Sequence, residues 1–93
     1  MNYGSKRWKK KREKILRRDK YIDKIKSRYG ITVEATIVHH IYPSEDYPEY
    51  AWEDWNLISV SASTHRELHK LDGSLSEKGI ELMTRTIPQE KKR

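Results

Sequence analysis

Apolar positions along the chain come in short stripes between charged residues, and the N-terminal stripes have helical spacing. In residues 5–18 the apolar positions are seven and eight apart, which places them on one narrow helix face, and Ser5 is a suitable N-cap. These apolar positions are Trp8, Ile15 and Leu16. Residues 21–29 can form a second helix that is stopped by Gly30. The second stripe consists of Ile22 and Ile25.

The middle of the chain has the composition of two strands joined by an irregular loop. Residues 35–41 are rich in β-branched side chains and predict a strand, which Pro43 ends. Residues 43–54 contain two prolines and five acidic residues, which favour a solvated loop over a second metal site. Residues 56–60 predict the return strand.

The last third of the chain predicts helices. Ser61 or Ser63 can cap a helix over residues 64–71, which the pair Asp72-Gly73 ends. A further short helix is expected over residues 74–84, and a frayed basic tail from Pro88. The order is therefore helix, strand, strand, helix, an α+β arrangement. We expect one domain, divided into a basic helical arm (1–30), a catalytic core (35–71) and a C-terminal helix with its tail (72–93).

Composition and charge narrow the class of protein. The 93 residues contain no cysteine, which excludes disulfides and thiolate zinc sites. Residues 1–28 carry a net charge of +10 and residues 29–93 a net charge of −4, so the overall +6 hides a localised basic arm. Such an arm suits a phosphate backbone, although a solvated basic tail has the same composition. The chain has no apolar run of the roughly 20 residues that span a membrane, so we expect a cytoplasmic protein.

All four histidines belong to one pattern, His39-His40 followed by His65 and His69. Two histidines at spacing i, i+4 share one helix face and suit a single metal ion, and a third ligand from the strand would leave an open coordination position. Adjacent strand residues point to opposite faces, so one of the paired histidines can bind the ion while the other faces the substrate. This division suits metal-assisted phosphodiester hydrolysis, and a purely structural metal site remains the alternative.

Three short strings carry a resemblance to a known family: V-H-H-I-x-P (38–43), W-N-L-I (55–58) and S-T-H-R-E-L-H (63–69). With the lead-in W-x-x-x-R-x-x-I-L-x-R-D-x-Y (8–21), they resemble small phage-type members of the HNH (ββα-metal, His-Me finger) endonucleases. The resemblance implies a ββα-metal core that hydrolyses DNA to 5′-phosphate and 3′-hydroxyl ends with one divalent ion, Mg²⁺, Mn²⁺, Ni²⁺ or Zn²⁺. It makes His39, His65 and His69 metal ligands, His40 the general base, and Asn56 a brace that orients His40.

The sequence departs from this family at the positions of a structural zinc, and its basic residues predict contacts to phosphate. Many small members bind a structural zinc through two C-x-x-C pairs, and those positions here hold Asp23, Lys26, Ser61 and Thr64. The zinc should therefore be absent, and we expect packing of Trp8, Ile15, Leu16, Ile22 and Ile25 to replace it. Expected phosphate contacts come from Lys9, Lys10, Arg12, Arg17, Arg18 and Arg66.

The implied partner is DNA, most naturally double-stranded. Similar small members are often phage-encoded and can act beside terminase and portal proteins during DNA packaging. The protein is expected to be a monomer or homodimer. Two rival functions stay open from the sequence: a non-catalytic DNA-binding accessory protein with a relic metal site, and an RNase.

Overall fold

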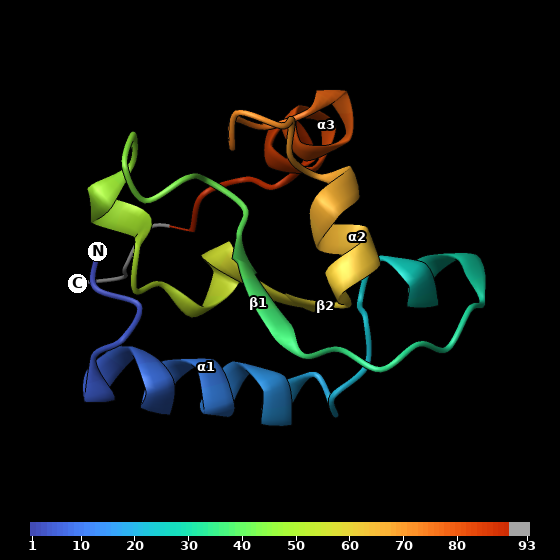
Figure 1. Ribbon diagram of the computed structural model, residues 1–93, viewed down its shortest axis with the longest axis horizontal. Helices are drawn as coiled ribbons and strands as arrows, with labels where there is room; N and C mark the ends of the chain where they lie inside the picture. The colour runs from blue at the N-terminus through green and yellow to red at the C-terminus, as the bar shows by residue number, and fades with distance from the viewer. Residues whose placement is uncertain (90–93) are drawn as a thin grey trace.

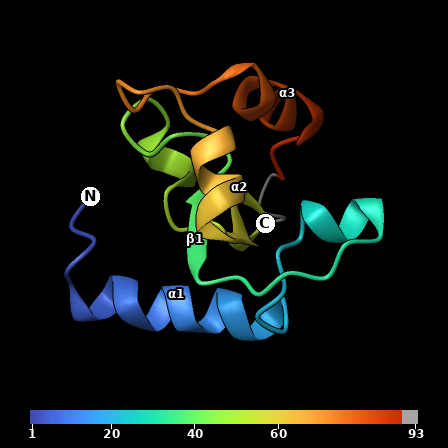
Figure 2. The same cartoon turned by 45° about the vertical axis from the view of Figure 1, so that its right-hand side comes forward.

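The computed structural model describes residues 1–89, so the end of the predicted basic tail, residues 90–93, lies outside the described residues. The helices and strands are α1 (Lys6–Arg18), β1 (Ile37–His40), β2 (Leu57–Val60), α2 (Ala62–Glu67) and α3 (Glu77–Arg85). Single 3-10 turns lie at Lys26–Tyr29, Pro48–Tyr50 and Asp54–Asn56. The strands form an antiparallel pair with α1 on one side and α2 and α3 on the other (Figure 1, Figure 2). Within residues 1–89 no helix has the length and apolar character needed to cross a bilayer.

The two-stranded hairpin separates two small apolar clusters, because successive residues of a strand point to opposite faces. Opposite His39 in the register is Ile58, and opposite His40 is Leu57. The cluster on the α1 side consists of Trp8, Ile15, Leu16, Ala35, Val38 and Leu57. The cluster on the α2 and α3 side consists of Ile41, Ile58, Val60, Leu68 and Leu82. The paired histidines therefore belong to opposite faces of one strand.

The first predicted helix is confirmed and the second is wrong. Helix α1 begins where expected, with the Ser5 hydroxyl accepting a hydrogen bond from the Trp8 amide at 3.1 Å. After α1, Lys20 and Tyr21 both take left-handed backbone angles with φ of 57°, so a right-handed helix cannot start at Tyr21. Only the 3-10 turn Lys26–Tyr29 forms, and it ends at Gly30, as expected, with φ of 75°.

Helix α2 is shorter than the sequence predicts. It starts after Ser61, whose hydroxyl accepts from the Thr64 amide, and it ends at Glu67 rather than near residue 71. His69 consequently lies just beyond the helix, in a β-bridge with Leu75. Helix α3 crowds this end: a Cβ on Gly79 would lie 2.3 Å from the Leu68 carbonyl oxygen, so only glycine permits this approach.

The segment between residues 18 and 24 covers the outer edge of β2, where backbone groups would otherwise remain unpaired. Its side chains and backbone satisfy these groups in order along the strand. The bonds are Arg18 Nη2 to Leu57 O at 2.7 Å, Ser59 N to Asp19 Oδ2 at 3.1 Å, Lys24 N to Ser59 O at 3.0 Å and Ser61 N to Asp23 Oδ2 at 2.9 Å. The N-terminal third is thereby fastened to the hairpin.

The four positions that the resemblance aligns with structural zinc ligands are joined here by hydrogen bonds around Asp23. The fully buried carboxylate accepts from the Lys26 amide at 2.9 Å and from the Ser61 hydroxyl at 2.8 Å, and Thr64 bonds Ser61 in turn. Burial raises the pKa of Asp23, but hydrogen bonds from Thr64, Lys26 and Ser61 outweigh it and hold the pKa below 3.8. The expected apolar packing is present for Trp8, Ile15 and Leu16, whereas Ile25 packs against the opposite cluster and Ile22 belongs to neither. The ionised Asp23 is a second clamp that the sequence did not predict.

Candidate metal centre and catalytic cleft

Three histidines converge between β1 and the end of α2. Each of His39, His65 and His69 offers a ring nitrogen, and these nitrogens all lie within 4.8 Å of one another. His39 is 2% exposed, and its Nε2 has no hydrogen-bond partner within the described part of the chain. A buried, unpaired imidazole nitrogen facing two others is costly unless it binds something. A divalent ion that accepts imidazole ligands fits this cluster.

Local contacts prepare these rings to act as ligands. The His69 Nδ1 donates to the His65 carbonyl oxygen at 3.0 Å, so the lone pair of the neutral ring is on Nε2. Burial, followed by the nearby charges of His69, His65 and His40, lowers the pKa of His39 to about 3. Burial and the neighbouring His69 also lower the pKa of His65. Near neutral pH, His39 and His65 therefore have lone pairs available for an ion.

His40 lies on the other face of β1, as the strand alternation predicts. Its Nε2 lies 2.9 Å from the Ala51 carbonyl oxygen, which can only accept, so Nε2 carries the proton and Nδ1 keeps the lone pair. Burial lowers the pKa of His40, the Ala51 hydrogen bond opposes this, and the N-terminal ammonium lowers it further. Although they belong to opposite faces of β1, His39 and His40 line one cleft of about 1570 Å³. The cleft therefore combines a cluster of metal-type ligands with a neutral imidazole that can accept a proton.

Asn56 holds the loop between the strands. It is fully buried, its Oδ1 accepts from the Tyr42 amide at 2.7 Å, and its Nδ2 donates to the carbonyl oxygens of Tyr42 and Tyr50, both at 3.0 Å. Tyr50 directly precedes Ala51, the residue that accepts from His40. The side chain of Asn56 is therefore linked to the His40 ring through the backbone of one residue, Ala51.

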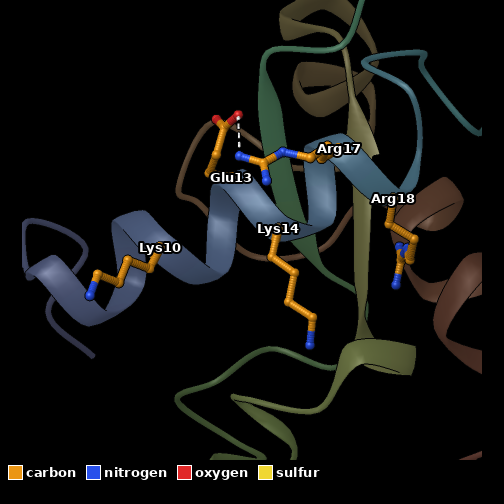
Figure 3. A pocket seen from close by; sticks show the side chains of 5 residues that line it. All are labelled: Lys10, Glu13, Lys14, Arg17 and Arg18. Carbon is orange, nitrogen blue, oxygen red and sulfur yellow. Dashed lines mark ion pairs between the residues drawn. The ribbon is translucent and has the colours of Figure 1, made fainter.

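The basic residues expected to contact phosphate lie on several sides of the molecule. Arg12 and Arg66 line the cleft, together with Lys70. Lys10 and Arg17 are exposed on the outer side of α1, where Arg17 pairs with Glu13 at 3.7 Å (Figure 3), and Lys9 is exposed on the same helix. Arg18 bonds Asp19 and two backbone carbonyls, so its guanidinium is already engaged within the protein. Of the α1 basic residues predicted to contact phosphate, Arg12 is the one that lines the cleft.

One contact in the cleft was not anticipated from the sequence. The indole of Trp8 stacks on the His40 ring with centroids 5.1 Å apart and planes 19° apart. Helical spacing predicted that Trp8 is buried, and it is 4% exposed. No local pattern connects residue 8 to residue 40, because their contact depends on how α1 crosses β1.

Comparisons with known proteins agree with this geometry. No family model and no curated protein matches the sequence. A similar solved structure is the HNH endonuclease of the deep-sea thermophilic bacteriophage GVE2, crystallised with a manganese ion. The alignment covers 68% of this chain and 68% of that one, at 27% sequence identity and a TM-score of 0.65. The similarity in fold to this phage protein, together with the ββα arrangement and the histidine triad, supports membership of the chain in the HNH endonuclease family.

Proposed function

We propose that this protein is a metal-dependent endonuclease that hydrolyses DNA phosphodiester bonds and leaves 5′-phosphate and 3′-hydroxyl ends. The observation that carries the proposal is the unpaired, buried Nε2 of His39 beside His65 and His69, with His40 in the same cleft. The phage endonuclease with manganese supports the choice of a divalent ion, although several such ions suit imidazole ligands.

The side chains of the cleft divide the chemistry between them. His39, His65 and His69 would hold the ion, and a bound divalent ion would polarise the scissile phosphate and stabilise the leaving oxygen. Nδ1 of His40 takes the proton of the attacking water, because Nε2 is committed to Ala51. Asn56 keeps that carbonyl in place through Tyr50.

Basic side chains of the cleft can contact a phosphate backbone, although Glu45, Asp46 and Asp72 line it as well and balance the charge of Arg12, Arg66 and Lys70. Arg12 and Arg66 line it and can contact phosphates near the scissile bond, which positions the strand without reading its sequence. Lys9, Lys10 and Arg17 on α1 would add longer-range attraction from outside the cleft. The proposed substrate is therefore duplex DNA, bound mainly through its backbone.

The proposal is tested by incubating supercoiled plasmid, and separately an RNA transcript of the same sequence, with the protein. Parallel reactions contain EDTA, Mg²⁺, Mn²⁺, Ni²⁺ or Zn²⁺, and a His40→Ala variant is the control for contaminating nuclease. We expect nicked or linear plasmid with at least one ion and none in EDTA or with the variant. Plasmid that is bound but never cut would mean a non-catalytic accessory protein. Cleavage of RNA alone would mean an RNase.

The biological setting follows from the same proposal. Small nucleases of the kind that this chain resembles can act beside terminase and portal proteins. The solved structure similar to this chain is also a bacteriophage protein. We propose that the chain acts in the cytoplasm of a bacterial host, as a monomer or homodimer, during processing of phage DNA. Co-purification with terminase subunits from infected cells tests this setting separately from the chemistry.

A further inference from the structure

The ring of His40 has close neighbours besides the carbonyl that accepts its proton. Trp8 lies parallel to the ring, at 5.1 Å between centroids and 19° between planes. Tyr3 meets His40 edge-on at 6.0 Å and meets Trp8 edge-on at 5.5 Å. Trp52 in turn contacts the edge of Trp8 at 6.0 Å. Trp8 and Tyr3 thus connect the N-terminal end of the chain to an imidazole on β1.

A single hydrogen bond does not fix an imidazole. The Ala51 carbonyl restrains Nε2, but the ring can still swing about this bond, because the second side-chain torsion of histidine has a broad energy well. A flat partner in parallel contact restricts this motion, since tilting the ring would lose contact with the indole face. The orientation of Nδ1, at the opposite side of the ring from the hydrogen bond, then depends on the Trp8 plane.

We propose that Trp8, supported by Tyr3, is a positioning residue that holds the plane of His40 so that Nδ1 faces the attacking water. The inference rests on the proposed role of His40 as the base. A base must lie within hydrogen-bond reach of the proton that it accepts, and a displacement of about 1 Å can cost on the order of 100-fold in rate. Helix α1 therefore contributes to catalysis through an aromatic side chain as well as through its charge.

The alternative is that Trp8 only fills the apolar cluster beneath α1. Leu16 provides the matched comparison, because it belongs to the same cluster and is equally buried, at 4% exposed. Leu16→Ala should destabilise the protein without removing an aromatic ring from His40. Trp8→Leu removes the ring but keeps an apolar side chain, and Trp8→Phe restores a smaller ring. Tyr3→Ala removes the edge contact at a residue that is 54% exposed, so it leaves the buried cluster intact.

The experiment measures kcat and KM for plasmid nicking, with Mn²⁺ affinity and melting temperature, for these four variants. We expect Trp8→Leu to lower kcat by about tenfold or more with little change in KM or Mn²⁺ affinity. Trp8→Phe should recover most of this loss, Tyr3→Ala should lower kcat by a smaller factor, and Leu16→Ala should keep kcat despite a lower melting temperature. Equal loss of kcat in Leu16→Ala, or wild-type kcat in either Tyr3→Ala or a folded Trp8→Leu, would overturn the proposal.

A second readout does not depend on cleavage. In the metal-free protein, the proton signals of the His40 ring should be shifted upfield by the stacked indole and should move downfield in Trp8→Phe, whose smaller ring shields them less. Unchanged signals would show that the rings are not stacked in solution, which also overturns the proposal. Full cleavage by His40→Ala would instead refute the assignment of the base. The two failures are therefore distinguishable.

Discussion

The Nε2–H of His40 donates a hydrogen bond to the carbonyl oxygen of Ala51 at 2.9 Å. This contact determines which ring nitrogen can act as a base, because a carbonyl cannot donate. It also makes the orientation of the proposed base dependent on the loop between the strands. Asn56 bonds the preceding carbonyl, that of Tyr50, and so controls where Ala51 lies.

Replacing Asn56 by aspartate should impair catalysis through this loop. The substitution keeps the shape of the side chain but removes the Nδ2 donors to Tyr42 and Tyr50 and places a charge against two carbonyls. We expect the free energy of unfolding to fall by about 2–4 kcal/mol and kcat for plasmid nicking to fall with it. Asn2→Asp is the control, because its exposed Oδ1 accepts from Gly4 and an aspartate can do the same. Wild-type nicking by the folded Asn56→Asp protein would refute the bracing role.

The metal-free protein should lose stability as the solution is acidified. Burial, and the charges of His69, His65 and His40, hold the pKa of His39 near 3, against an ordinary value of 6.5 in the unfolded chain. Below pH 6.5 His39 binds a proton in the unfolded chain but stays neutral in the folded protein. The free energy of unfolding should therefore fall by up to about 1.4 kcal/mol per pH unit because of this group. Urea denaturation in EDTA between pH 7 and pH 5 measures the slope.

His39→Leu is the matched control for this slope. The lowered pKa values of His40 and His65 also make stability fall with acidification, and this contribution remains in His39→Leu. The slope of unfolding free energy against pH should therefore be steeper in the wild type by about 1.4 kcal/mol per pH unit, which corresponds to one proton. Identical slopes in the two proteins would mean that His39 titrates normally in the fold.

Substitution of Asp23 should loosen the N-terminal third of the chain. Asp23→Asn turns one acceptor oxygen into a donor, which must then face amide or hydroxyl donors from Lys26 and Ser61. The expected loss is about 2–4 kcal/mol, from buried donors left without acceptors. Asp46→Asn makes the same chemical change at an exposed position and should cost little. Chemical denaturation of both variants gives the comparison, and equal stabilities would show that the Asp23 clamp is dispensable.

The cleft-lining and outer basic residues should differ in their contribution to DNA binding. Arg12→Gln with Arg66→Gln removes charge from the cleft, whereas Lys10→Gln with Arg17→Gln removes the same charge from the outer side of α1. Each lost phosphate contact should reduce the slope of log binding constant against log salt concentration by about 0.9 in magnitude. Filter binding at several salt concentrations, in a His40→Ala background, should show the larger reduction for the cleft pair. A larger reduction for the outer pair would place the DNA along α1 instead.

Local signals in the sequence were sufficient to predict the hairpin and the placement of the paired histidines on opposite faces of one strand. Strand alternation separates His39 from His40, and the caps at Ser5 and Ser61 depend only on neighbouring residues. The sequence could not predict the left-handed angles at Tyr21, which divert the chain toward β2.

Contacts between distant segments account for the rest of what was missed. Helix α2 ends before His69 where α3 packs closely through Gly79. The spacing of residues in the sequence does not predict such packing between helices. The stacking of Trp8 on His40 and the bonds from Asp19 and Asp23 to the edge of β2 also join segments about 30 to 40 positions apart. The helical arm was correctly predicted to be basic, but its charges divide between the cleft, the outer surface and the protein's own backbone.

The central claim is that His39, His65 and His69 hold one divalent ion while His40 acts as the base. Calorimetric titration of Mn²⁺ into wild type, His40→Ala and His69→Ala, with plasmid nicking measured on the same preparations, tests it most directly. The account predicts that His40→Ala binds Mn²⁺ as wild type does but nicks DNA at least about 100-fold more slowly. His69→Ala should lose Mn²⁺ affinity and nicking together. A loss of Mn²⁺ affinity in His40→Ala as severe as in His69→Ala would contradict the account.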